Sequence, residues 1–290
     1  MGDCLCIPFS PESSQGSTVA PQSTVNDTKR PDSRKAGKKG ELNDELAISQ
    51  AAQHCLQQGS IPMALQPMVM LETEEAFGFE ALARPLTAEG APIPPHRFIT
   101  LIEHMGLMVQ VGELLMHSAF AAARQEQLAP RGLELSLNIS PCQFAHRGLT
   151  DRLLAIAKQF HMPAELLNVE ITETAVVTNE SVPKDEITSL RKHGVKVSLD
   201  DFGTGLSNLN RLCEVPADAV KIDGSFTAAL TEQRSRLIMA SLANMFLDLG
   251  LDAVVEGIET EAQHTLLKEL GFQKGQGYLF GKPKSISVLS

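Results

Sequence analysis

The feature that most constrains the fold is an alternation of short β-rich runs with longer helical stretches, from about residue 60 to the C-terminus. The expected strands are 63–69, 78–83, 134–139, 168–172, 196–200, 219–222, 253–255 and a short last one at 277–280. The expected helices are 95–104, 109–127, 151–160, 182–193, 227–249 and 261–270. This order is typical of a mostly parallel sheet wrapped by helices. The first two runs are separated by a turn too short for a crossover helix, so we expect them to be antiparallel.

The length of the chain suits one barrel with a tail. Of the 290 residues, 43% are hydrophobic, which is enough to fill an α/β barrel of about 250 residues. Residues 1–41 are rich in Ser, Pro, Thr and Gln and end in a basic cluster, a composition that predicts a disordered polar and basic tail. We therefore expect a tail at 1–41 and one domain at 42–290, folded as a TIM-like (β/α)8 barrel with an antiparallel first strand.

Charge and patterning exclude several classes of protein. The formal net charge of −10 argues against direct binding along DNA or RNA, which calls for a basic face. The longest apolar candidate, at 237–255, is interrupted by Asn244, Asp248 and Asp252, so no membrane span is expected. Five scattered cysteines without a C-x-x-C pair fit a reducing cytoplasm. The eight histidines show no close ligand spacing, so no histidine-based zinc motif is predicted.

Polar residues stand at or near the ends of most of the expected strands. Together they form what we call the strand-end set: Glu80, Asn138, Glu170, Asp200, Asp201, Lys221 and Glu256. Their separations are mostly about one βα unit, which brings them to the same end of a barrel, the end where barrel enzymes place active sites. Any one of them could instead be a helix cap or a turn former, but that reading requires a separate coincidence at each strand.

The chemistry of the strand-end set favours hard cations. Carboxylates and one amide oxygen, without histidine or thiol, suit Mg²⁺ or Mn²⁺ better than Zn²⁺. Adjacent Asp200 and Asp201 are costly unless cations neutralise them, and one aspartate can bridge two metals. Two metal ions are a recurrent device for phosphoester hydrolysis. Lys221, if it points inward, would orient water or stabilise developing charge.

Two other sequence patterns do not indicate a functional site. The segment from Asp201 to Gly205 contains the letters of a kinase magnesium motif, but no Gly-rich loop, V-A-I-K strand or H-R-D loop accompanies it, so the kinase hypothesis is rejected. The second pattern is an apolar series at helical spacing, which we assign to the core rather than to a binding surface. That series is Leu237, Met239, Leu242, Met245, Phe246 and Leu249.

The chain resembles the EAL-domain family over residues 61–283. The signature stands at Glu80-Ala81-Leu82-Ala83-Arg84, and six further blocks follow in order. They are Asn138-Ile139-Ser140, Glu170-Ile171-Thr172-Glu173, Asp200-Asp201-Phe202-Gly203-Thr204-Gly205, Lys221-Ile222-Asp223, Glu256-Gly257-Ile258-Glu259-Thr260 and Gln276-Gly277-Tyr278. A lone E-A-L tripeptide would carry no information, whereas seven ordered blocks are specific.

The resemblance implies a phosphodiesterase that hydrolyses cyclic di-GMP to linear pGpG with two divalent metal ions and so affects biofilm formation or motility. It implies that Glu80, Asn138, Glu170, Asp200, Asp201 and Glu256 hold the metals. Glu256 and Lys221 would act on the attacking water, and Gln66, Arg84 and Gln276 would contact the substrate. Glu173 would position the loop that begins at Asp201. A homodimer and a regulatory protein partner are also implied.

Three alternatives stay open. A receptor that binds cyclic di-GMP without cutting it would usually lack an acidic ligand, and here all are present. An interaction module would bind a protein partner without nucleotide turnover. An enolase-like barrel also uses strand-end carboxylates, Mg²⁺ and lysine, but the Asp200-Asp201 pair and the Gln276 block argue against it.

Overall fold

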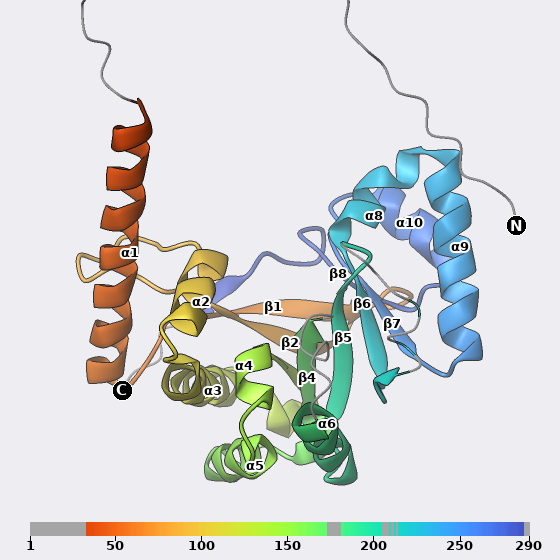
Figure 1. Ribbon diagram of the computed structural model, residues 1–290. Helices are drawn as coiled ribbons and strands as arrows, with labels where there is room; N and C mark the ends of the chain where they lie inside the picture. Colours follow the sequence, from red (N-terminus) through yellow and green to blue (C-terminus); the bar gives the residue numbers. More distant parts are fainter. Residues whose placement is uncertain (1–32, 173–180, 205–208, 210–211, 213, 287–290) are drawn as a thin grey trace, which may run out of the picture. The chain divides into compact units, whose positions relative to one another are not determined.

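The computed structural model describes residues 33–172, 181–204, 209, 212 and 214–286. The chain divides into two units, Met1–Gly40 and Glu41–Ser290, and the fold that follows is that of the second. Its strands form one closed sheet with helices on the outside (Figure 1).

Eight strands close the barrel. They are β1 (Met63–Met70), β2 (Ala76–Ala83), β3 (Glu134–Asn138), β4 (Leu167–Thr172), β5 (Lys196–Phe202), β6 (Ala219–Ile222), β7 (Asp252–Val255) and β8 (Lys274–Gln276). Strands β2 to β8 are parallel in sequence order, and β1 is antiparallel to both β2 and β8. The predicted TIM-like barrel with an antiparallel first strand is therefore confirmed. A ninth strand, β9 (Lys284–Ile286), pairs with the start of β1.

The helices that the structure describes are α1 (Ser33–Gln58), α2 (Pro95–His104), α3 (Met108–Gln125), α4 (Pro141–Phe144), α5 (Leu149–Gln159), α6 (Ser181–Lys192), α8 (Gly224–Ala228), α9 (Gln233–Asp248) and α10 (Glu261–Glu269). Local signals set several of the starts. Thr260 and Gln263 form a reciprocal capping box at the start of α10, and Ser140 and Gln143 form another at α4, each satisfying backbone N–H groups that a helix leaves unpaired.

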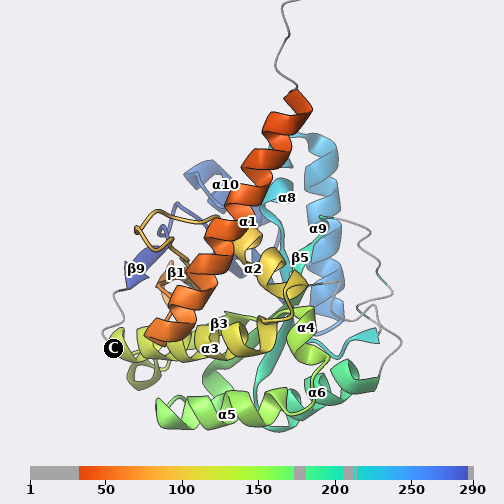
Figure 2. The same cartoon turned by 60° about the vertical axis from the view of Figure 1, so that its left-hand side comes forward.

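The core lies between the strands and the helices. Every position of β6, and all but the last of β4, is buried, as expected of parallel strands covered on both faces. A smaller cluster joins α1 to α2 and α3, where Ile48, Ala51 and Cys55 pack with Phe98 and Ile102, among others. Figure 2 shows the lower part of α1 beside these two helices. This helix begins at Ser33, inside the segment predicted to be disordered. The division of the chain at residue 41 stays a prediction.

The expected last strand is misplaced in the sequence analysis. The strand is Lys274–Gln276 rather than 277–280. At Gly277 the chain passes so close to Ile258 that an added Cβ would lie 2.0 Å from the Ile258 carbonyl oxygen. The backbone then turns, and the N–H groups of Phe280 and Gly281 both donate to the Gly277 carbonyl. The apolar residues 278–280 resemble a strand in sequence, but they follow the turn.

The apolar series expected to lie in the core is only partly buried. Met239 and Phe246 are buried, and Leu242 and Met245 pack against the core. Leu237 is 63% exposed and Leu249 is 55% exposed, so assigning these two to the core was wrong. The reason is the helix repeat: successive members of the series drift around α9, and its two ends turn away from the barrel.

Candidate active site

The strand-end set converges inside the barrel. Asn138 at the end of β3 donates from Nδ2 to Glu80 Oε1 of β2 at 2.8 Å, and Gln276 at the end of β8 donates from Nε2 to Glu80 Oε2 at 2.8 Å. Glu80 is thus held from both sides around the barrel, by β3 on one side and by β8, beyond β1, on the other. The ring closes because β1 and β8 pair, which brings Gln276 to the start of the set.

Lys221 is the central cation of the set. Its Nζ lies 2.8 Å from Glu256 Oε1, 2.9 Å from Glu170 Oε2, 3.1 Å from Glu80 Oε2 and 3.5 Å from Asp200 Oδ1. The lysine is 2% exposed. Burial lowers the pKa of Lys221, but the four carboxylates raise it well above the ordinary value. One positive charge therefore faces four carboxylates, which leaves an excess of negative charge in a space shielded from water.

A bulge directs the two aspartates. Leu199 pairs with Val220 and Phe202 pairs with Ile222, so Asp200 and Asp201 together oppose the single residue Lys221. Asp201 has φ +56°, a conformation rare outside glycine and tolerated by aspartate. Bulges are frequent next to active sites because they redirect side chains. This one places Asp200 inside the barrel, 8% exposed, while Asp201 is exposed above it.

The surroundings separate the pKa values of the carboxyls. Burial and then the nearby Glu80 raise the pKa of Glu170 well above its usual range. Burial raises the pKa of Glu256 to about 7 despite the nearby Lys221. Burial and then Asp200 raise the pKa of Asp201. Burial also acts to raise the pKa of Glu80, but Lys221 and the bonds from Gln276 and Asn138 outweigh it, so this pKa is lowered. Carboxyls that differ in this way can take different roles in proton transfer.

Three buried oxygen atoms at this site, two in the strand-end set and one on Gln276, lack a hydrogen-bond partner. They are Glu170 Oε1, Asp200 Oδ1 and Gln276 Oε1. Buried oxygen atoms without a donor are rare in proteins and point to an ion or water at the site. Carboxylate and amide oxygens are the ligands that Mg²⁺ and Mn²⁺ prefer. The excess of negative charge and the unpaired acceptors both fit divalent cations.

A cavity of about 420 Å³ opens over the set. Residues from the strand-end set that line it are Glu80, Asp200, Asp201, Lys221 and Glu256. Gln66 and Gln276, which the resemblance assigned to the substrate, also line it. Arg84 does not line it, and its Nη1 donates to the carbonyl of neighbouring Ala83 at 2.8 Å. Glu173 lies outside the described residues.

Some residues of the site were not predicted as such. Leu82, Glu259 and Tyr278 line the cavity, and Tyr278 is 54% exposed. All three stand in the quoted blocks, so their position in those blocks was an available signal. Below the set, Asn168 donates to Ser136 Oγ at 2.8 Å, and Ser198 donates to Asn168 Oδ1 at 2.7 Å. These buried hydrogen bonds join β3, β4 and β5 beneath the strand-end set. In the sequence they appear only as single polar residues inside three apolar strands, which did not predict the contacts between them.

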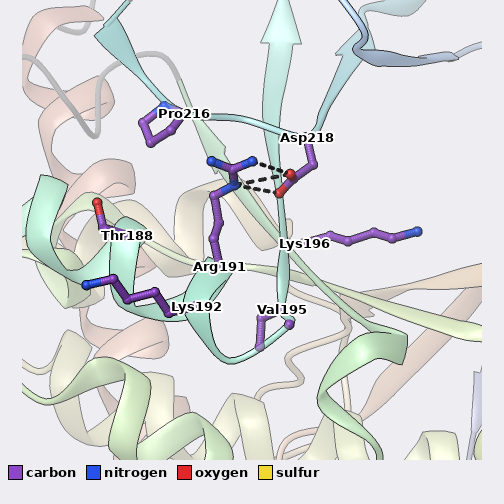
Figure 3. Close-up of a pocket in the computed structure, with 8 residues that line it drawn as sticks. Thr188, Arg191, Lys192, Val195, Lys196, Pro216 and Asp218 are labelled. Carbon is purple, nitrogen blue, oxygen red and sulfur yellow. Dashed lines mark hydrogen bonds and ion pairs between the residues drawn. The ribbon is translucent and has the colours of Figure 1, made fainter.

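A second cavity, of about 410 Å³, lies where β5 and β6 begin (Figure 3). Arg191 donates from Nη2 to Asp218 Oδ1 at 2.7 Å and from Nε to both carboxylate oxygens at 3.1 Å. Lys196 pairs with Glu134. The guanidinium and this ammonium are thus already paired, and no predicted site residue lines the cavity.

The fold and the site together define a class of protein, the (β/α)8-type barrel enzymes. In this one, the acidic strand-end set, whose oxygen atoms suit divalent cations, lies at the carboxyl ends of the strands. The EAL domain model matches residues 48–283. The chain belongs to the EAL domain family. Among the described residues, no helix has the length and apolar character needed to cross a bilayer.

Relatives of known name place the chain more closely. It is 32% identical over 258 residues to the probable cyclic di-GMP phosphodiesterase PdeI of Escherichia coli, an alignment that covers 87% of this chain and 32% of PdeI. It is 32% identical over 229 residues to the cyclic di-GMP phosphodiesterase RocR of Pseudomonas aeruginosa, covering 79% of this chain and 58% of RocR. The solved complex of the PaMucR phosphodiesterase with c-di-GMP has a TM-score of 0.71 at 32% identity, covering 80% of this chain and 97% of that one. The chain thus spans about a third of PdeI and somewhat over half of RocR.

Proposed function

We propose that this chain hydrolyses cyclic di-GMP to linear pGpG with two divalent metal ions, Mg²⁺ or Mn²⁺. The observation that carries the proposal is the buried strand-end set, in which four carboxylates share one lysine. Buried oxygen atoms of Glu170, Asp200 and Gln276 that accept no hydrogen bond add to it. Membership of a family with relatives named as cyclic di-GMP phosphodiesterases supplies the substrate. Glu80, Asn138, Glu170, Asp200, Asp201 and Glu256 would hold the metals, which supply positive charge against the phosphodiester and its developing negative charge.

The residues around the set divide the remaining tasks. Glu256, which lines the cavity and lies 2.8 Å from Lys221, accepts the proton of the attacking water. Lys221 stabilises the negative charge that develops on phosphate oxygens. Gln66 and Gln276 face the cavity and orient the nucleotide. Arg84 would have to leave the Ala83 carbonyl to contact a phosphate, where its guanidinium can make paired hydrogen bonds.

The wider role follows the same proposal. Glu173 would hold the loop that begins at Asp201. Lowering the cyclic di-GMP level in the cytoplasm would affect biofilm formation or motility. A homodimer and a regulatory protein partner are further expectations from the family resemblance.

The test is turnover of cyclic di-GMP by the full chain with Mg²⁺ or Mn²⁺, followed by chromatography of the nucleotides. We expect pGpG from the wild type only when metal is present. Glu80→Gln should lower the rate by at least about 10–100-fold. Mutating a residue that only hydrogen-bonds to a metal ligand already has an effect of that size, and Glu80 would be a ligand itself. Glu75→Gln, an exposed change outside the cavity, is the matched control. Binding without cleavage would establish the receptor alternative. If the chain neither bound nor cleaved the nucleotide, the interaction-module alternative would be the one to pursue.

A further inference from the structure

A second group of ligand-type side chains lies outside the strand-end set. Glu74 belongs to the turn between β1 and β2, while Glu261 and His264 lie at the start of α10. None of the three lines the catalytic cavity. The turn and the helix meet here, since Lys268 of α10 also pairs with Glu72 of the turn at 3.0 Å.

The imidazole of His264 is fixed on one side. The residue is 5% exposed, and its ring packs edge-on against Phe280 with centroids 5.2 Å apart. Nε2 lies 2.7 Å from the carbonyl oxygen of Leu71. A carbonyl can only accept, so Nε2 must carry a proton. This contact orients the ring and leaves Nδ1 as the nitrogen that faces the glutamates.

Nδ1 points at two carboxylates. It lies 3.7 Å from Glu74 Oε1 and 3.7 Å from Glu261 Oε2, and the three atoms all lie within 4.8 Å of one another. Among the described residues, Nδ1 has no hydrogen bond, and the nearby cation Lys268 is paired with Glu72. In the neutral ring, a lone pair and two negative charges converge on one point, which is unfavourable unless a metal ion or a proton on Nδ1 lies between them.

The two distances from His264 Nδ1 to the carboxylate oxygens are close to those between ligands of one ion. Ligand atoms about 2.0–2.1 Å from a tetrahedral Zn²⁺ lie about 3.3 Å apart, close to the 3.7 Å found here. One imidazole nitrogen with carboxylate oxygens suits Zn²⁺ and neighbouring first-row metals. A metal-bound histidine commonly donates its other ring N–H to a backbone carbonyl, as His264 does to Leu71.

We propose that Glu74, Glu261 and His264 form a second divalent-cation site, selective for Zn²⁺ or a similar transition metal and separate from the strand-end set. The ion ties the β1–β2 turn to α10. The strand-end set contains only oxygen ligands besides Lys221, so the two sites differ in the metals that they prefer. The proposal is independent of phosphodiesterase activity.

The test is equilibrium dialysis of the full chain against Zn²⁺ near neutral pH, with Mg²⁺ in excess to compete at the strand-end set, followed by metal analysis. The variant is Glu74→Gln with Glu261→Gln. The matched control is Glu75→Gln with Glu269→Gln, which makes the same change of charge in the same turn and helix at exposed positions. All four glutamates are exposed, so folding should be unaffected in both, as circular dichroism will verify.

We expect the wild type and the control to hold one Zn²⁺ more than the variant, with at least a 100-fold difference in affinity at this site. The ¹⁵N signal of His264 Nδ1 should move on addition of Zn²⁺ in the wild type and not in the variant. Equal Zn²⁺ content in the wild type and the variant would overturn the proposal and identify the cluster as an ion pair with a protonated imidazole. An equal loss in the control would also overturn it, since the effect would then be one of surface charge.

Discussion

Lys221 shows how a single residue stabilises a site that would otherwise repel itself. Its ammonium is shared among Glu80, Glu170, Asp200 and Glu256. A buried ion pair contributes little net stability when intact, because both charges lose their hydration. Removing one partner is different, since the remaining charges stay buried without compensation.

Lys221→Met is therefore expected to lower the free energy of unfolding of the metal-free protein by about 3–5 kcal/mol. Lys196→Met is the control, because Lys196 of neighbouring β5 pairs with Glu134 on a partly exposed face, where an ion pair contributes about 0–1 kcal/mol. Urea unfolding in the presence of a chelator measures both. Similar losses in the two variants would show that the carboxylates do not depend on the lysine.

At the scale of elements, two neighbouring residues of α9 show how strongly the contribution of a side chain to stability depends on its burial. Phe246 is 1% exposed and packs edge-on against Phe202 of β5, with centroids 5.4 Å apart, whereas the next residue, Leu247, is 70% exposed. Phe246→Ala should cost about 3–5 kcal/mol of stability, and Leu247→Ala less than about 0.5 kcal/mol. Chemical unfolding of both variants gives the comparison. If Leu247→Ala proved as costly, this face of α9 would be covered by something outside the chain.

Glu186 of α6 provides the start of α5 with its hydrogen-bond acceptors. Its Oε1 accepts from Gly148 N at 2.7 Å, and its Oε2 accepts from Thr150 N at 3.0 Å and from Thr150 Oγ1 at 2.7 Å. Glu186→Gln turns an amide N–H₂ toward these donors, so we expect a loss of about 2 kcal/mol. Asp185→Asn, at an exposed neighbouring position, is the control.

The loss from Glu186→Gln should depend on pH. Burial acts to raise the pKa of Glu186, but the hydrogen bonds from Thr150 and Gly148 outweigh it, so the pKa is lowered in the folded state. A lowered pKa stabilises the fold above the unfolded value of about 4.3, and this contribution is lost as pH falls through the folded value. The difference between wild type and variant should therefore shrink from pH 7 to acid. A difference that is constant with pH would contradict this role for the carboxylate.

Element patterns also show how far the sequence predicts this fold. Strands β1 to β7 were predicted because each buried run is flanked by polar or turn residues. The last strand was misplaced because β8 consists of only three residues, Lys-Gly-Gln, none of which is a large apolar residue. The apolar residues after Gly277 look more like a strand in sequence, but they follow a turn. Helix α1 was missed because basic residues and glycines dominate its start, although Ile48, Ala51 and Cys55 already show helical spacing.

The residues of the site were predictable for a related reason, and its geometry was not. Polar residues at strand ends must converge in a barrel, so Glu80, Glu170 and Lys221 could be grouped from the sequence. The bulge that directs Asp200 and Asp201 depends on pairing with β6, which no local pattern encodes. The cluster at His264 takes Glu74 from a distant turn, so histidine spacing could not indicate it.

At the scale of the whole molecule, the strand-end set links metal binding to the stability of the barrel. Its residues come from β2 to β6 and from the position directly after β7, so repulsion within the set acts on most of the strands at once. A ligand that binds only the folded state at 100 times its Kd adds about 2.7 kcal/mol. For a domain of this size we therefore expect saturating Mg²⁺ to raise the Tm by about 5–10 °C over the chelated protein.

Asp200→Asn distinguishes this effect from a general effect of salt. The variant removes one of four carboxylates that share a single lysine, and the Oδ1 atom of this carboxylate accepts no hydrogen bond. The chelated variant should therefore be at least as stable as the chelated wild type. It should also lose most of the Tm increase with Mg²⁺, because a metal ligand is gone. Differential scanning calorimetry of both proteins, with Mg²⁺ and with chelator, tests the two expectations together. If Mg²⁺ raised the Tm of both proteins equally, the ion would be acting away from the strand-end set, and the metal assignment would have to be abandoned.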